Sequence, residues 1–296
     1  MDKFLGKTTK TLNSDLERIA ITCGDAGENH QGMEMVGSLG SQGSGFTVQD
    51  LTKIKQYLAT LNKQADLIDL SNTMAIGPDK QKKEAAVLIL RNYLDETEIN
   101  QLYQELTSVP WDNKYWDTRR QKVLNKRARE NLLFLKGVSQ EADYPNKKGR
   151  IVDINSLSKF DEILTQLFDI INQETDGKAQ HLIAEGNRYF KKKMIDSKLK
   201  NVKNGIGWHG DAERRKVICL CIGGVQYPMH WQWFYKHKPL NLNPYKVALN
   251  SGDVYIMSEE AVGQRWKNSS EYTMRHSAGD VSFTKYKKEW IEHFTN

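Results

Sequence analysis

The residues best suited to chemistry lie in the segment GIGWHGDAERRKV, which runs from Gly205 to Val217. His209 and Asp211 are two positions apart, so on an extended strand both side chains project from the same face. An imidazole and a carboxylate that converge on one point provide two ligands for a divalent metal ion. An HxD pair also occurs by chance in many proteins, and the alternative is a histidine and an aspartate in a surface loop.

A third ligand has to come from elsewhere in the chain, and His276 in YTMRHSAG is the candidate. It lies at the end of an expected strand. Two histidines and one carboxylate leave neighbouring coordination positions open, which is typical of non-haem iron(II) that binds a cosubstrate and dioxygen. A catalytic zinc site could use the same ligands, although zinc has no redox chemistry.

Several short motifs surround this set in a characteristic order. Asn187 and Tyr189 form an N-x-Y pair upstream, Trp208 precedes the first histidine, and Glu213 follows the aspartate. A G-D-hydrophobic segment, GDVYIMS at 252–258, precedes the distal histidine. In this order the motifs resemble the AlkB-like branch of the 2-oxoglutarate/iron(II) dioxygenases, over about residues 85 to 290.

The resemblance implies a double-stranded β-helix, or jelly-roll, core with flanking helices. It implies that His209, Asp211 and His276 hold Fe(II), and that Asn187 and Tyr189 bind 2-oxoglutarate, which is consumed together with O2. The expected reaction is hydroxylation or oxidative demethylation of a substrate, with succinate and carbon dioxide as coproducts.

The end of the family pattern differs in this chain. AlkB-like enzymes carry R-x-N-x-T-x-R after the distal histidine, whereas this sequence has VSFTKYKK. A lysine can pair with the C5 carboxylate of 2-oxoglutarate as a point charge. Lys285 is assigned that role, with Lys287 and Arg275 as rivals, and the alternative is that the two lysines are solvated charges at a strand end. The insert between Tyr189 and His209 is also longer than the family spacing.

Hydrophobic periodicity predicts an α+β chain. Residues 1–80 are expected to form an N-terminal extension or accessory module, and residues 81–296 the oxygenase domain. Helices are expected after the capping residues Thr47, Asp95 and Ser158. The expected strands, typical of a sandwich or barrel, are Ala85–Arg91, His181–Tyr189, Lys216–Ile222, Met229–Tyr235, Tyr245–Leu249, Asp253–Ser258, Tyr272–His276 and Val281–Tyr286. Residues 191–204 are interpreted as a solvated loop.

Composition limits the class of protein. The chain has 296 residues with a net charge of +6. It has no apolar run of about 18 residues and no signal peptide, and its three cysteines cannot build a disulfide framework. We therefore expect no membrane association and a soluble, intracellular protein, cytoplasmic or nuclear. The sequence pI of about 9.0 permits a polyanionic partner without requiring one.

Residues 111–129 mix Trp111, Tyr115 and Trp116 with arginines and lysines. This chemistry suits phosphate pairing with base stacking, so a nucleic acid or nucleobase is the first substrate hypothesis. The structural alternative is an amphipathic helix. A second hypothesis is a hydroxylase of a protein, an amino acid or another small molecule, and a third is a β-sandwich binding module without catalysis. Structural or exposed roles are expected for His30, His181, His237 and His293.

Overall fold

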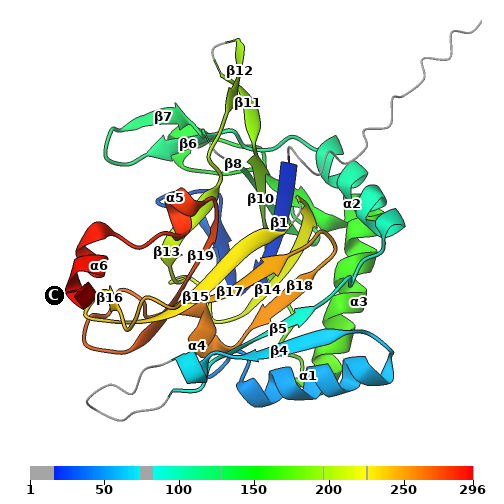
Figure 1. Ribbon diagram of the computed structural model, residues 1–296. Coiled ribbons are helices and arrows are strands. Elements are labelled where there is room, and N and C mark those ends of the chain that lie inside the picture. Colours follow the sequence, from blue (N-terminus) through cyan, green and yellow to red (C-terminus); the bar gives the residue numbers. More distant parts are fainter. Residues whose placement is uncertain (1–16, 74–82, 128, 196, 225, 296) are drawn as a thin grey trace, which may run out of the picture.

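Two curled sheets form the centre of the molecule, and helices pack on the larger one (Figure 1). The computed structural model describes residues 17–73, 83–127, 129–195, 197–224 and 226–295. Over these residues the fold is mixed α+β and dominated by strands, which confirms the predicted class. The larger sheet has eight strands in the order β4 (Ala65–Asp69), β5 (Ala86–Leu90), β18 (Val254–Met257), β14 (Val217–Gly223), β1 (Glu17–Gly24), β10 (Ile183–Phe190), β8 (Arg129–Leu135) and β9 (Ile151–Asp153).

The smaller sheet faces the larger one across a shared apolar layer. It contains β13 (Gly205–His209), β19 (Thr273–Gly279), β15 (Tyr227–Tyr235), β16 (Lys238–Pro239) and β17 (Tyr245–Leu249). Trp231 and Met274 from this sheet pack in one cluster with Cys221 and Met257 from the other. The alternation of side chains along each strand therefore gives the two sheets a common interior.

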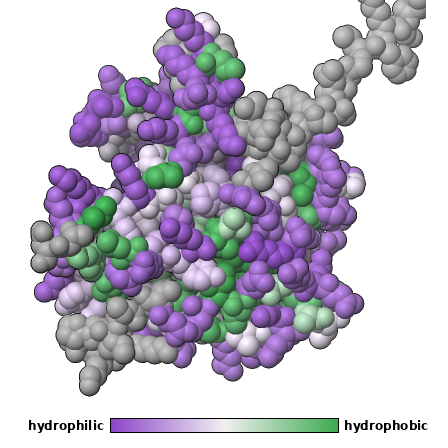
Figure 2. Space-filling view, in the orientation of Figure 1, coloured by the Kyte–Doolittle hydropathy of each residue, from purple (hydrophilic) through white to green (hydrophobic). Residues whose placement is uncertain are grey.

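Three two-stranded hairpins extend from this centre. They are β2 (Ala26–Glu28) with β3 (Met35–Gly37), β6 (Lys114–Asp117) with β7 (Lys122–Asn125), and β11 (Lys192–Ile195) with β12 (Lys198–Asn201). The last two rise together at the top of Figure 1, and Figure 2 shows that their surface is mostly hydrophilic. The segment 111–129 thus contains the β6–β7 hairpin and not the amphipathic helix considered as an alternative. The segment 191–204, expected to be a loop, contains the paired strands β11 and β12.

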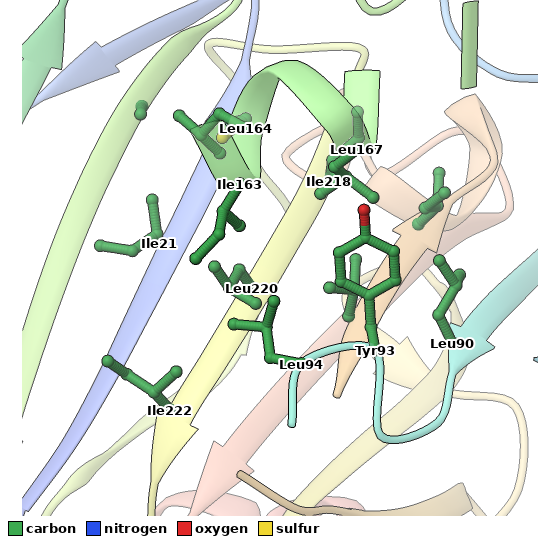
Figure 3. Packing of buried hydrophobic residues seen from close by; sticks show 14 of the residues in the cluster. Ile21, Leu90, Tyr93, Leu94, Ile163, Leu164, Leu167, Ile218, Leu220 and Ile222 are labelled. Atoms are coloured by element: carbon green, nitrogen blue, oxygen red, sulfur yellow. The ribbon is translucent and has the colours of Figure 1, made fainter. Parts of the chain in front are cut away.

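Three helices cover the outer face of the larger sheet. They are α1 (Val48–Thr60), α2 (Glu96–Ser108) and α3 (Ser158–Glu174). In Figure 3 the apolar side chains of α3 pack against strands β1 and β14, where every second residue points outwards. Figure 3 labels Ile163, Leu164 and Leu167 of α3 and, in the same cluster, Ile21, Ile218, Leu220 and Ile222 of the two strands.

The helix starts follow the sequence in two cases out of three. Thr47 and Asp95 form the expected capping boxes at α1 and α2. The expected cap of α3 by Ser158 is wrong, because the helix already includes that residue. The Glu105 carboxylate of α2 instead accepts hydrogen bonds from the backbone N–H groups of Lys159 and Phe160, at 2.9 Å each. A tertiary contact thus replaces the local cap.

The domain boundary expected near residue 80 does not separate two structural units. β1 lies between β10 and β14 and pairs antiparallel with both. β4 pairs with β5 in the same sheet. Described residues before position 80 therefore belong to the same sheet as strands after position 180. Strand pairing joins segments that are far apart in sequence, which composition along the chain does not reveal.

The strand expected over Val281–Tyr286 is wrong. This segment contains the short helix α5 (Val281–Thr284), followed by α6 (Lys288–Thr295), and α4 (Glu259–Val262) precedes β19. Short 3-10 turns occupy Ser71–Thr73, Tyr144–Asn146 and Ile154–Ser156. In the described part of the chain, no helix has the length and apolar character needed to cross a membrane.

If β1 is integral to the core, truncation of Ile21, which the strand directs towards the helices, should destabilise the whole molecule. Ile21 is 0% exposed. We expect Ile21→Ala to lower the free energy of unfolding by about 3 kcal/mol, through lost apolar contact and the cavity it leaves. Ile291→Ala on α6, where the side chain is 42% exposed, is the matched control and should change it by less than about 1 kcal/mol. Equal urea midpoints for the two variants would contradict the central position of β1.

Candidate metal centre and cavity

A cavity of about 1070 Å³ lies between the two sheets. On the side of the larger sheet, three neighbouring strands line it with alternate residues in matching register. These are Glu185, Asn187 and Tyr189 of β10, Arg18, Ala20 and Thr22 of β1, and Cys219 and Cys221 of β14. The smaller sheet contributes His209 and His276. Side chains from both sheets therefore form walls of the cavity.

The sequence-predicted metal ligands come together in this cavity. His209 and His276 are direct cross-strand partners on β13 and β19, and Asp211 lies just beyond the end of β13. One ligand atom from each of the three residues lies within 4.8 Å of the others. Asp211 Oδ1 is 3.6 Å from His209 Nε2 and 3.7 Å from His276 Nε2. These distances exceed a hydrogen bond but place three donor atoms around one point.

Backbone contacts orient this group. The Nδ1 atom of His209 lies 2.7 Å from the carbonyl oxygen of Gly207. A proton on Nδ1 donates to that carbonyl and leaves the Nε2 lone pair directed at Asp211. The backbone N–H of Asp211 donates to the Val262 carbonyl at 3.1 Å. A Cβ atom on Gly210 would lie 2.2 Å from the Gly263 oxygen, so only glycine permits this close approach.

The electrostatics of the cluster suit a cation. Burial, reinforced by the neighbouring His276, lowers the pKa of His209 to about 4, so the ring is neutral at pH 7. Burial alone would raise the pKa of Asp211, but His276, Arg214 and His209 outweigh it and hold that pKa well below its usual range. Neutral imidazole and ionised carboxylate are the protonation states that bind a divalent metal.

Asn187 and Tyr189, expected to bind the cosubstrate, line the cavity. Asn187 is held by a buried network: its amide donates to Glu185 at 3.1 Å, and its oxygen accepts from Asn131 at 2.6 Å. Asn131 in turn accepts from the Lys126 ammonium group at 2.9 Å. The side chain of Asn187 is therefore fixed before any ligand binds.

The three basic residues expected to anchor the cosubstrate have different positions. Lys285 and Lys287 lie at the rim of the cavity and are exposed, and Lys287 is 3.6 Å from Glu289. Arg275 faces the other side of β19, where its guanidinium donates to the Trp266 carbonyl at 3.0 Å and packs on Phe234. The structure therefore brings the two lysines to the cavity edge but turns Arg275 away from it.

Arg18 is a cavity residue that the sequence analysis missed. It is 4% exposed, and its guanidinium carbon lies 4.4 Å from the centre of the Tyr227 ring. One nitrogen donates to the Leu249 carbonyl at 2.9 Å. The other two nitrogens, and the Tyr227 hydroxyl, are buried without a hydrogen-bond partner among the described residues. The alternation Arg-Ile-Ala-Ile-Thr was the signal that could have identified this strand.

A second missed group lines the cavity from the segment around β2. Glu28 is half-buried, and burial together with Glu213 and Glu185 raises its pKa to about 7, against opposing effects from Gly32 and Arg214. His30, expected to be structural or exposed, stacks on Tyr115 of β6 with ring centres 3.7 Å apart. Both line the cavity, so this wall carries carboxylates next to an aromatic platform.

Trp208, on the other side of the metal ligands, is fixed by the C-terminal helices. Its ring stacks on Tyr286 with centres 5.3 Å apart, and its N–H donates to the Thr284 carbonyl at 3.2 Å. The segment 281–286, which was expected to be a strand, thus packs against Trp208 at the border of the cavity.

Fold and site define a mixed α+β protein with a candidate metal centre in a cavity between two curled sheets. No protein-family model matches the chain. It is 33% identical over 273 residues to a protein of Acanthamoeba polyphaga mimivirus described as "Uncharacterized protein R156". The alignment covers 91% of this chain and 98% of the viral protein. The chain belongs to the same family as that viral protein.

Removal of one ligand should abolish metal binding. We expect His209→Ala to weaken Mn(II) or Co(II) binding at pH 7 by at least about 100-fold. Removal of a residue that only hydrogen-bonds a metal ligand already costs about 10–100-fold, and loss of the ligand itself should cost more. His181→Ala, at an exposed histidine, is the matched control and should bind like the parent protein. Titration calorimetry and the visible spectrum of bound Co(II) measure the difference. Unchanged binding by His209→Ala would remove the metal assignment.

Proposed function

We propose that this protein is an Fe(II)- and 2-oxoglutarate-dependent dioxygenase with a double-stranded β-helix core. The observation that carries the proposal is the convergence of His209, Asp211 and His276 in a cavity that also contains a buried, incompletely paired arginine. When bound, Fe(II) would supply the redox chemistry that couples oxidation of a C–H bond to decarboxylation of the 2-oxo acid.

The residues present fit iron(II). Two imidazoles and one carboxylate are the donor set of non-haem iron oxygenases, and the described residues of the cluster include only these three donors. A structural zinc site would require a fourth protein ligand. Burial keeps His209 neutral, whereas His276 and Arg214 keep Asp211 ionised against the effect of burial.

Arg18 is the residue that we assign to the distal carboxylate of 2-oxoglutarate. Its two unpaired nitrogens lie in the same buried space as the Tyr227 hydroxyl, so a carboxylate there would satisfy polar groups that otherwise cost free energy. Along β1, Arg18 and Thr22 have the spacing of the first and third named positions in R-x-N-x-T-x-R, with Ala20 at the asparagine. This assignment replaces Lys285, which is exposed at the rim.

Other side chains of the cavity would hold the reactants without taking part in redox steps. Tyr189 borders the space beside Arg18, its partner in the β-ladder. Trp208, which is held by contacts with Thr284 and Tyr286, would border the bound reactants beside His209.

The preferred substrate is a nucleic acid or nucleobase, because Arg129 lines the cavity and Tyr115 stacks on the cavity residue His30. A second candidate is a protein side chain, an amino acid or another small molecule bearing an amine. The specific observation in its favour is the wall of Glu28, Glu185 and Glu213, which would attract a cation. Exocyclic amino groups of bases could use the same carboxylates as acceptors.

The proposal predicts iron-dependent conversion of 2-oxoglutarate to succinate, and a specific role for one arginine. We expect Arg18→Met to raise the KM for 2-oxoglutarate by about 30-fold or more, since hydrogen bonds to charged groups contribute about 1.5–3 kcal/mol each. Lys285→Met, the matched control, should raise it by less than about 3-fold because the lysine is solvated.

Arg18 is buried, so its substitution could affect folding as well as binding. Arg18→Lys keeps the positive charge and should recover part of the affinity for 2-oxoglutarate, while urea unfolding reports the stability of each variant. Absence of iron-dependent succinate release from the parent protein would contradict the enzyme assignment. An unchanged KM in a folded Arg18→Met variant would contradict only the anchor.

A further inference from the structure

A row of buried polar side chains connects the end of the β6–β7 hairpin with the wall of the cavity. Lys126 follows β7, Asn131 lies in β8, and Glu185 and Asn187 lie in β10. Asn131 and Asn187 are direct cross-strand partners. All four residues are at most 8% exposed, and Asn131 is only 1% exposed. Polar groups at this depth need hydrogen-bond partners, and these residues provide them for one another.

The hydrogen bonds of this row all run in one direction. The Nζ atom of Lys126 donates to Asn131 Oδ1 at 2.9 Å, and Asn131 Nδ2 donates to Asn187 Oδ1 at 2.6 Å. Asn187 Nδ2 in turn donates to Glu185 Oε1 at 3.1 Å. Each residue therefore passes a donor to the next, from the lysine to the carboxylate.

The two end groups determine the orientation of the two amides between them. An amide alone permits two orientations, in which its oxygen and nitrogen exchange places. A lysine ammonium group only donates and an ionised carboxylate only accepts. Asn131 must therefore turn its oxygen to Lys126, and Asn187 must turn its nitrogen to Glu185. With both ends fixed, only one arrangement satisfies every group in the row.

Both end groups are held in place by further contacts. Lys126 Nζ also donates to the Asn29 carbonyl at 2.8 Å, and the second carboxylate oxygen of Glu185 accepts from Arg214 at 2.7 Å. Burial lowers the pKa of Lys126 to about 7, against an opposing effect of Asp112. A neutral amine still has two N–H groups, which suffice for the Asn29 carbonyl and for Asn131. The direction of the row is therefore the same in both protonation states of the lysine.

We propose that Lys126 and Asn131 are positioning residues, which orient the Asn187 amide as a hydrogen-bond donor to an oxygen of the bound 2-oxo acid. Asn187 lines the cavity whereas Lys126 and Asn131 do not, so they act through it. One N–H of the Asn187 amide is used by Glu185, and the other bonds to no group among the described residues. The inference rests on the proposed function, because it concerns recognition of the cosubstrate.

A purely structural role for the row makes a different prediction. Lys126 would then only tie the end of the hairpin to Asn29, and its loss would lower stability without a specific effect on the ligand. A buried lysine costs more free energy than a well-packed apolar residue of similar size, and selection of one arrangement is a recognised use of such groups. The two roles can be separated by measuring affinity and stability in the same variants.

Asn131→Asp tests the orientation with little change in side-chain size. It keeps an acceptor for Lys126 but removes the donor to Asn187, whose amide would then lie between two carboxylates that attract both of its N–H groups. We expect the Kd of 2-oxoglutarate for the Mn(II)-loaded full chain to rise about 10-fold or more, because a hydrogen bond to a charged group is lost. Titration calorimetry measures this Kd, and the affinity for Mn(II) itself should change by less than about 3-fold.

A double-mutant cycle with Asn187→Ala separates positioning from general destabilisation. If Asn131 acts through Asn187, Asn131→Asp should change the Kd by less than about 2-fold in the Asn187→Ala background. Lys126→Met removes one end of the row while Glu185 still directs Asn187. It should raise the Kd about 3- to 10-fold in the parent protein and less than about 2-fold in that background. In turnover with Fe(II), the KM for 2-oxoglutarate should rise in parallel while kcat stays within about 3-fold.

Tyr144→Phe is the matched control for stability. It removes a hydrogen bond of 2.9 Å to Asp112 in the same buried region and leaves the row intact. It should lower the urea midpoint but bind 2-oxoglutarate like the parent protein. Equal losses of affinity in the parent and Asn187→Ala backgrounds, or a folded Asn131→Asp variant with parental affinity, would overturn this inference and leave the proposed function intact. A parent protein that neither binds 2-oxoglutarate nor releases succinate with iron would refute the proposed function, and this inference with it.

Discussion

The pairing of β1 with both β10 and β14 is the interaction on which the rest of the structure depends. Without it the larger sheet would divide between β14 and β10, since no other strand among the described residues joins these two. Side chains from the two faces of β1 belong to two different regions of the structure. Ile19 and Ile21 face the helices in the principal core, whereas Arg18 and Thr22 face the cavity. Core packing therefore fixes the position of the arginine that we assign to the cosubstrate.

The two buried arginines of the cavity, Arg214 and Arg18, differ in how fully they are paired. Arg214 donates to Glu185 at 2.7 Å and to Glu213 at 2.9 Å, and it also favours the ionised form of Asp211. Arg18, by contrast, uses only one of its three nitrogens within the described residues. Burying a cation without full pairing is costly, and this cost is offset when an anion binds. In the proposed function, the carboxylate of 2-oxoglutarate would supply the pairing that Arg18 lacks.

The candidate metal-binding cluster could be predicted from sequence because two of its residues are two positions apart. The third, His276, lies in a segment with alternating residue types that forms part of β19. Alternation along residues 18–22 could have identified β1 as a strand but not its partners. These lie more than 150 positions later, so the sequence did not indicate that Arg18 faces the cavity. The segment 281–286 was misassigned because alternation over six residues does not distinguish a strand from a helical turn that covers Trp208.

The charge of the side chains changes from negative to positive along β10 and the segment that follows it. Inside the cavity this strand presents Glu185, Asn187 and Tyr189, and immediately beyond it come the exposed Lys191 and Lys192. A phosphate would be attracted to the outer lysines and repelled by the inner carboxylates, whereas an uncharged base meets no such barrier. This distribution of charge supports the proposed substrate, a nucleic acid whose phosphates stay outside the cavity while a base enters it.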